Sequence, residues 1–310
     1  METTQEVRPL PPLLRNLSYS GLGELHACPR KFVLNKLKAS YLDRDNLRSV
    51  TFAFGHAVGT GIQCTLEGKS EQQILFDMFL AWDYGDIYGE EEKSNKSFWT
   101  AVQAVQLFKH VRDSPLLHEY ELLVVDGRAA VELSFRITTP DGFKYRGFVD
   151  VVLRHRVTGE LLVLELKTTS ATSINPAQYK NSGQALGYSV VLDRFAPGKS
   201  SYKVLYLVLS SKTLEFTPLE FTKSYLQRAE WIHSFLLDCQ ILSLYWEQQH
   251  WPQNGASCYD FFKECEHFQT CGLKLENQIP AKNFTVEPEP EEFQIELTLL
   301  DLIESQLERT

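Results

Sequence analysis

The chain has 310 residues, of which 43% are hydrophobic and 23% charged, an ordinary globular composition with room for one large domain and appendages. Its apolar runs are too short to cross a membrane, and the opening METTQEVRPLPPLLRN lacks the basic and apolar regions of a secretory signal. Of the formal net charge of -9, -7 falls in residues 284–310, so the nearly neutral remainder can carry a basic groove and charge does not exclude nucleic acid.

Helical patterns dominate the first third of the chain. Leu22, Leu25, Cys28 and Phe32 recur every three to four positions, which predicts a helix face interrupted at Pro29. Apolar periodicity then predicts further helices at about 54–66, 70–82 and 97–112.

Strand chemistry replaces this pattern from residue 118 to 168, with hairpin turns at Asp126-Gly127 and Pro140-Asp141-Gly142. A helix at 176–192, strands near 202–209 and 213–221, and a long helix at about 222–249 follow. A strand meander that leads through a crossover helix to another strand predicts an α/β (α+β) fold, in which a mixed central sheet is flanked by helices.

Three charged residues interrupt the apolar hairpin RGFVDVVLRHRVTGELLVLELKTTS: Asp150, Glu165 and Lys167. If Thr158-Gly159 is a two-residue turn, Asp150 pairs with Lys167 and Val152 with Glu165, so all three charges share one face. A turn one residue earlier leaves this unchanged, whereas a slip of one residue would send Asp150 to the other face. The opposite face is purely apolar and is the expected core side.

Asp150 and Glu165 become diagonal neighbours, about 7 Å apart at the backbone, which leaves room for a cation between their carboxylates. Two acids and a lysine on one patch suit Mg2+, which takes hard oxygen ligands and keeps several waters for chemistry. The structural alternative is that Lys167 forms an ion pair with either acid, although partly buried ion pairs stabilise poorly compared with apolar residues of similar volume.

Three motifs in order resemble the PD-(D/E)XK nuclease superfamily, specifically its RecB-like branch, which includes CRISPR-associated and bacteriophage exonucleases. The motifs are GFVD at 147–150, ELK at 165–167 and QALGY at 184–188, the last on a predicted helix where its Gln and Tyr share one face. The resemblance covers roughly residues 18–273 and implies a restriction-endonuclease-like fold. It also implies that the chain is a phage protein, located in the host cytoplasm.

The resemblance assigns roles to single residues. It implies that Asp150, Glu165 and the Leu166 carbonyl bind the catalytic Mg2+ or Mn2+, and that Lys167 positions or activates the attacking water. Gln184 and Tyr188 can hydrogen-bond a phosphate or position an active-site group.

One position departs from the RecB-like pattern. The family usually places a metal-binding His four residues after the Gly of F-G-x-x-x-H, but FGHAVGTGIQ has Gly59 there and its histidine at His56. Two interpretations of His56 stay open, a metal ligand from another turn of the helix or a polar surface residue. Glu132 is a weaker candidate for the same region and could simply face solvent.

The six cysteines are expected to be thiols or metal ligands, because the absence of a signal or membrane span predicts a cytoplasmic, reducing environment. Cys64 and Cys239 lie in apolar helical patterns and are interpreted as buried thiols. The spacing of Cys258, Cys265 and Cys271, with Cys28 far upstream, is by itself weak evidence for a metal.

Several RecB-like nucleases hold a 4Fe-4S cluster with one N-terminal cysteine in a C-P-R/K setting and three cysteines near the C-terminus. The resemblance therefore implies such a cluster on Cys28, Cys258, Cys265 and Cys271. The alternatives are Zn2+, with His267 as a further candidate ligand, and unligated core thiols.

The predicted organisation is an arm at 1–17, one nuclease domain at 18–273 and an acidic tail at 274–310. Within the domain we expect a helical part at 18–115, a catalytic sheet at 116–221, and a helix with the cysteine cluster at 222–273. The tail is expected to be a solvated, disordered extension, or alternatively to dock on a recombination protein.

The function implied is a metal-dependent DNA nuclease, an exonuclease on DNA ends or single strands in recombination, repair or DNA processing. The alternative is a catalytically silent protein that retains the fold and binds nucleic acid or a partner, motivated by Gly59 in place of the histidine. No G-x-x-x-x-G-K-[ST] loop is present, so an ATPase motor would be a separate chain.

Overall fold

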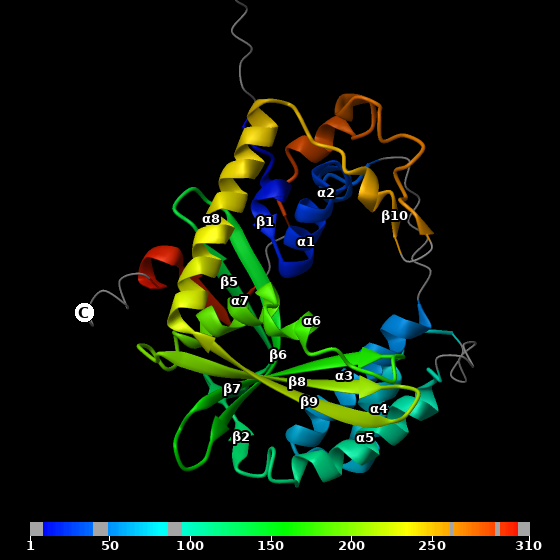
Figure 1. Ribbon diagram of the computed structural model, residues 1–310, viewed down its shortest axis with the longest axis vertical. Helices are drawn as coiled ribbons and strands as arrows, with labels where there is room; N and C mark the ends of the chain where they lie inside the picture. Colours follow the sequence, from blue (N-terminus) through cyan, green and yellow to red (C-terminus); the bar gives the residue numbers. More distant parts are fainter. Residues whose placement is uncertain (1–8, 40–48, 86–94, 261–262, 289–291, 303–310) are drawn as a thin grey trace, which may run out of the picture.

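The computed structural model describes residues 9–39, 49–85, 95–260, 263–288 and 292–302. Its centre is a sheet in the order β12-β5-β6-β7-β8-β9, with β1 and β2 also paired to β6 (Figure 1). The strands of this sheet are β1 (Asn16–Leu17), β2 (Tyr120–Leu122), β5 (Val131–Thr138), β6 (Lys144–His155), β7 (Leu161–Thr169), β8 (Ser201–Ser210), β9 (Glu215–Ser224) and β12 (Ile295–Thr298). Two small hairpins join β3 (Val124–Val125) to β4 (Arg128–Ala129), and β10 (Tyr259–Asp260) to β11 (Lys263–Glu264).

The sheet is mixed, as predicted. Parallel pairing joins β7 to β8, β12 to β5 and β1 to β6, whereas the other neighbours are antiparallel. The chain crosses from β7 to β8 through α6 (Ala177–Lys180) and α7 (Gly183–Leu192), the predicted crossover. The predicted turns are confirmed at Asp126-Gly127, between β3 and β4, and at Gly142, between β5 and β6.

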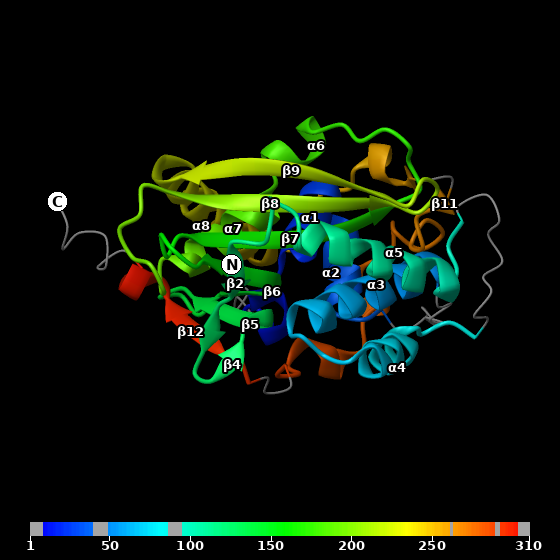
Figure 2. The same ribbon diagram turned by 90° about the horizontal axis from the view of Figure 1, so that it is seen from below.

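Two apolar cores lie on opposite faces of the sheet. The helices are α1 (Tyr19–Ala27), α2 (Pro29–Lys36), α3 (Val50–Leu66), α4 (Glu71–Ala81), α5 (Phe98–Arg112), α6, α7 and α8 (Tyr225–Glu247). One core packs α3, α4 and α5 on the sheet; the other packs α1, α2, α7 and α8 on it. Figures 1 and 2 show α3, α4 and α5 grouped together, away from α8. Among the described helices, none has the length and apolar character needed to cross a membrane.

Gly61 lets α3 approach its two neighbouring helices closely. A Cβ at this position would lie 2.5 Å from the Val105 side chain on α5 and 2.7 Å from the Met78 sulfur on α4. Because those distances are far below van der Waals contact, any side chain at Gly61 would push the three helices apart. This packing fixes α3 against the sheet.

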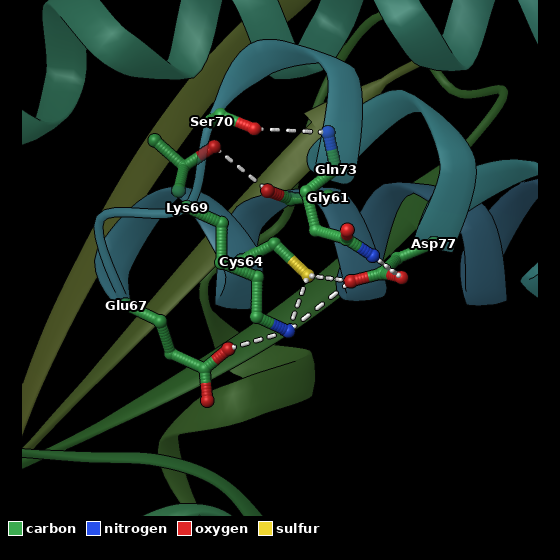
Figure 3. Close-up of polar contacts among 8 residues, drawn as sticks. Gly61, Cys64, Glu67, Lys69, Ser70, Gln73 and Asp77 are labelled. Carbon is green, nitrogen blue, oxygen red and sulfur yellow. Dashed lines mark hydrogen bonds and ion pairs between the residues drawn. The ribbon is translucent and has the colours of Figure 1, made fainter.

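A polar network at the corner between α3 and α4 holds the same helices (Figure 3). The Cys64 thiol donates to Asp77 Oδ2 at 3.3 Å, and Lys69 Nζ contacts the same oxygen at 3.1 Å. Cys64 is 3% exposed, which confirms the prediction of a buried thiol; Cys239, at 5%, is likewise buried in α8. Burial raises the pKa of the Cys64 thiol, so this sulfur stays protonated.

Two predicted helix bounds are wrong. The helix expected at 176–192 is two helices, because Ser182 has an extended backbone with ψ of 123° between α6 and α7. The helix expected from 222 begins at Tyr225, because β9 continues to Ser224. Ser224 and Gln227 then form a capping box that satisfies the first backbone N–H groups.

The hairpin between β6 and β7 has a different register from that given by a Thr158-Gly159 turn. Val152 pairs with Val163 rather than with Glu165, and the backbone N–H of Gly159 closes the turn by donating to the His155 carbonyl. The observed register is that of a turn one residue earlier in the chain. It shifts the pairing by two residues, so each side chain keeps the face of the sheet that parity assigned to it.

The expectation of one apolar core face and one charged face is wrong for this hairpin. Val152 and Val163 are fully buried in the core under α7 and α8, while Val151 and Leu164 are buried in the core under α3. A central strand of a sheet covered on both faces carries apolar residues on both. The three charged residues therefore need a part of the hairpin that neither apolar core covers.

The acidic tail is not a solvated extension over residues 292–302. β12 pairs in parallel with β5, and Ile295, Leu297, Leu299 and Leu302 are 3–6% exposed. Burial of these apolar side chains outweighs the local excess of acids, which face outward between them. Leu17, expected in an outlying arm, is likewise fully buried in β1. Docking of the tail on a partner stays a prediction, and residues 303–310 lie outside the described residues.

Candidate active site

The charged residues of the hairpin lie where β6 and β7 separate. On this side of β6, β1 pairs at Lys144 and Tyr145, and β7 pairs only from Val151 to Arg154. Among the described residues, the stretch 146–150 therefore has no strand partner on that side. β7 continues beyond Leu164 alongside β8 alone. The opening between β6 and β7 leaves room for polar side chains between the two apolar cores.

Asp150 and Glu165 face this opening from the two separating strands. Asp150 Oδ2 accepts the Leu166 backbone N–H at 2.8 Å, which fixes one carboxylate to the other strand. Burial raises the pKa of Asp150 to about 6, although that hydrogen bond opposes the shift. Burial and the charge of Asp150 raise the pKa of Glu165 to about 8. The two carboxylates thus form an electrostatically unfavourable pair.

Glu165 has one oxygen that the protein leaves without a partner. The residue is 1% exposed; its Oε1 contacts Lys167 Nζ at 2.7 Å, whereas its Oε2 has no hydrogen-bond partner among the described residues. A buried carboxylate oxygen without a donor is costly, and native proteins rarely tolerate one without a functional reason.

Lys167 is connected to α7 by a chain of hydrogen bonds. Its Nζ donates to Gln184 Oε1 at 3.1 Å, and Gln184 Nε2 donates to the Tyr188 hydroxyl at 2.7 Å. Burial lowers the pKa of Lys167, whereas the Glu165 carboxylate raises it. The net shift of the pKa is upward, so the amine stays charged. The ion pair considered from sequence is thus formed with Glu165, within a larger network.

Gly147 explains the first position of the GFVD motif. A Cβ there would lie 2.9 Å from the Phe135 ring, which packs edge-on against Tyr188 with ring centroids 5.9 Å apart. Only glycine leaves room for this ring, so Gly147 places Phe135, and Phe135 supports the tyrosine that ends the hydrogen-bond chain.

A cleft of about 600 Å³ opens in front of these groups, lined by Asp150, Glu165, Lys167 and Gln184 together with one face of α3. His56 is exposed on that face, as is Phe52, which is 72% exposed. Gly59 also lines the cleft, and apart from its own helix backbone no described residue lies within 4 Å of the place where its Cβ would be. The structure thus brings His56 to the cleft.

Glu132 also lines the cleft, from β5. Its Oε1 accepts from Gln63 Nε2 on α3 at 2.6 Å. Gln63 was missed at the sequence level, because a glutamine on a helix carries no motif and only the packing of α3 on the sheet reveals its neighbour. Among the described residues, no three His, Cys, Asp or Glu side chains are arranged to hold one metal ion directly.

Comparison with known proteins identifies the architecture. A profile described as "PD-(D/E)XK nuclease superfamily" matches residues 16–272. The chain belongs to the PD-(D/E)XK nuclease superfamily. Its mixed central sheet flanked by helices is the restriction-endonuclease-like fold of that superfamily. No curated protein matches the chain. A crystal structure of a protein from Eubacterium rectale, named "Putative exonuclease", is 12% identical with a TM-score of 0.48, covering 88% of this chain and 99% of that one.

The four cysteines of interest in this PD-(D/E)XK chain gather at one end of α2. Burial raises the pKa of the Cys271 thiol, and the charge of Arg30 opposes this shift. The thiols of Cys28, Cys265 and Cys258 are near enough to raise the same pKa further. A hydrogen bond also joins the two segments, because the Arg30 side chain donates from Nε to the Cys271 backbone carbonyl at 3.1 Å.

His267 lies in the same region but is bound elsewhere. It is 1% exposed, and its Nε2 lies 2.7 Å from Asn35 Oδ1 on α2. The histidine thus holds the cysteine segment against the helix, a structural contact that the sequence alone did not indicate.

Proposed function

We propose that this protein is a metal-dependent DNA nuclease that hydrolyses phosphodiester bonds, acting as an exonuclease on DNA ends in recombination, repair or DNA processing. The observation that carries the proposal is the pairing of half-buried Asp150 with buried Glu165 at the point where two strands separate, with one Glu165 oxygen lacking a donor among the described residues. Superfamily membership supplies the nuclease class, and the residues supply the chemistry.

The donor set fits a hard divalent cation. Two carboxylates and the Leu166 carbonyl are oxygen ligands, and Mg2+ or Mn2+ binds few protein groups and keeps several waters. A cation would also satisfy the Glu165 oxygen that has no donor and offset the repulsion between the two acids. When bound, the ion lowers the pKa of a bound water and neutralises charge on the scissile phosphate.

The surrounding side chains orient the reaction. Lys167, held by Glu165 and Gln184, presents a positive charge to the cleft, where it binds the phosphate or positions the attacking water. Gln184 and Tyr188 keep the lysine in place. Phe52, exposed at the cleft, offers a ring on which an unpaired base can stack, which favours single-stranded DNA at the site.

End-labelled linear DNA and circular DNA, incubated with and without Mn2+, test this function. Asp150→Asn and Lys167→Ala are expected to abolish cleavage while the protein stays folded, because both groups face the cleft rather than the core. Lys203→Ala, which changes an exposed lysine paired with Glu220 on the neighbouring strands, is the matched control and should keep full activity. Wild-type cleavage by Asp150→Asn or Lys167→Ala, with stability lost instead, would favour a structural ion pair.

A silent nucleic-acid-binding protein is the second candidate. Gly59 favours it, because the α3 position from which the family supplies a histidine has no side chain here. DNA binding by the wild-type protein without cleavage in Mg2+ or Mn2+ would support this candidate over the nuclease.

We also propose that Cys28, Cys258, Cys265 and Cys271 bind a 4Fe-4S cluster. Supporting it, the four thiols are close enough to affect the Cys271 pKa, yet no three of them converge on a single ion in the described residues. Zinc needs four ligands on one atom about 2.3 Å away, whereas a cluster spreads four thiolates over four irons. Four thiols gathered at one end of α2 match the number of thiolates that such a cluster takes.

A further inference from the structure

Glu132 has a backbone conformation that side chains rarely adopt. Its φ is +46°, in the left-handed region, within a strand whose register pairs Val131 with Val151 and Leu133 with Val149. A residue with a side chain is held there only when its surroundings enforce it, and such residues concentrate at functional sites. The side chain of this left-handed residue lines the cleft.

The Glu132 carboxylate is also held from the opposite wall. Gln63 is 8% exposed on α3, and its amide donates to Glu132 Oε1 at 2.6 Å. An ordered donor that is itself buried fixes the position of one carboxylate oxygen and leaves the other available to the cleft. A residue needed only to complete the strand would require neither the strained backbone nor this donor.

Glu132 lies close to the acids at the strand opening. The pairing of Val131 with Val151 and of Leu133 with Val149 places it opposite Asp150, and both residues line the same cleft as Glu165. Glu165, whose Oε2 is buried and without a donor among the described residues, lines the same cleft. Since no three such side chains there converge on one ion, contact between Glu132 and a cation would pass through water.

We infer that Glu132 is a positioning residue that accepts hydrogen bonds from the water shell of a divalent cation bound by Asp150 and Glu165. The inference rests on the proposed metal site and assigns a role to a residue outside it. Carboxylates in this outer position orient bound water and add negative charge where the cation sits, and their removal typically weakens metal binding about 10- to 100-fold.

Calorimetric titration of the wild-type protein with Mn2+, in the absence of DNA, tests the inference without measuring cleavage. Glu132→Gln keeps an oxygen that can accept from Gln63 but loses the charge, so a purely structural role predicts unchanged affinity. We expect its Mn2+ affinity to fall about 10- to 100-fold. Glu132→Gly should lower affinity as much while its Tm is no lower than that of the wild type, because glycine relieves the backbone strain.

Asp126→Gly is the matched control. Asp126 is also an acid in the left-handed region, with φ of +49°, but it lies in the β3–β4 turn and does not line the cleft. Its Mn2+ affinity should equal that of the wild type. Glu132→Gln binding within twofold of the wild type, or an equal loss in Asp126→Gly, would overturn the role of Glu132. No Mn2+ binding by the wild-type protein would instead overturn the metal site itself.

Discussion

Glu165 should destabilise the metal-free protein, and removing its charge should therefore stabilise it. Because the pKa of this buried carboxyl is raised from 4.5 to about 8, the folded state resists its ionisation. At 1.36 kcal/mol per pKa unit, the shift corresponds to about 5 kcal/mol as an upper limit. Glu165→Gln, which resembles the protonated carboxyl in shape, should regain much of that free energy in alkaline buffer.

The pH dependence follows from the direction of the shift. Between pH 4.5 and about 8 the unfolded chain has released the Glu165 proton and the folded chain still holds it, so wild-type stability falls as pH rises through this window. Below the window Glu165 is protonated in both states, and the two proteins should converge. Since 1 kcal/mol moves the Tm of a domain of this size by about 2–4 °C, the expected gap at pH 9 is on the order of 10 °C.

Thermal unfolding in EDTA at pH 5 and pH 9 measures this gap. Glu160→Gln, an exposed carboxylate five residues earlier in the chain, is the matched control and should leave the Tm unchanged at both pH values. Mn2+ should raise the Tm of the wild type and not that of Glu165→Gln, because only the former keeps both ligands. A Glu165→Gln protein no more stable than wild type at pH 9, or a gap equally large at pH 5, would refute the reasoning.

Metal binding at pH 7 should release about one proton per site from the Asp150–Glu165 pair, so the titration heat should vary with the ionisation enthalpy of the buffer. Identical heats in buffers of different ionisation enthalpy would argue against this proton release. Protein purified without oxygen should be brown, and Cys28→Ser should remove the colour as fully as Cys271→Ser. Metal analysis that finds one zinc and no iron would exclude the cluster. Leu297→Ala should lower the free energy of unfolding by about 2–5 kcal/mol, because the side chain is buried. The control Glu296→Ala, at an exposed position of the same strand, should lower it by at most about 1 kcal/mol. Equal losses in the two variants would mean that burial of β12 does not stabilise the fold. Phe52→Ala should weaken single-stranded DNA binding roughly 5- to 100-fold with Mn2+ affinity unchanged, and equal binding would exclude stacking at that ring.

Much of the fold was predictable, because side-chain periodicity is a local property. The helices at α3, α4 and α5 follow the apolar spacing of the sequence, and the hairpin turn at Asp126-Gly127 needs two residues with positive φ, which that pair supplies. The shared direction of Asp150 and Glu165 followed from strand parity, which a two-residue register shift leaves intact.

Features that depend on tertiary contacts were not predictable. The separation of β6 from β7 requires β1, a two-residue strand more than a hundred positions away, to take the place of the hairpin partner. The left-handed backbone of Glu132 has no sequence signature, since glycine or asparagine is the usual residue there. The acidic composition of the tail concealed alternating apolar residues such as Ile295 and Leu297, whose burial needs an open edge at β5.

The pairing of β12 with β5 also has a consequence for biogenesis. Ile295 pairs with Phe135, 160 positions earlier, so β5 leaves the ribosome long before its edge partner exists. During that interval the edge presents unpaired N–H and C=O groups to any other extended chain, which is a route to aggregation. At translation rates of about 5–20 residues per second, the exposed edge persists for roughly 8–30 seconds. The nascent chain is thus expected to need a chaperone, or slow docking of β5 on the sheet, until β12 has been made.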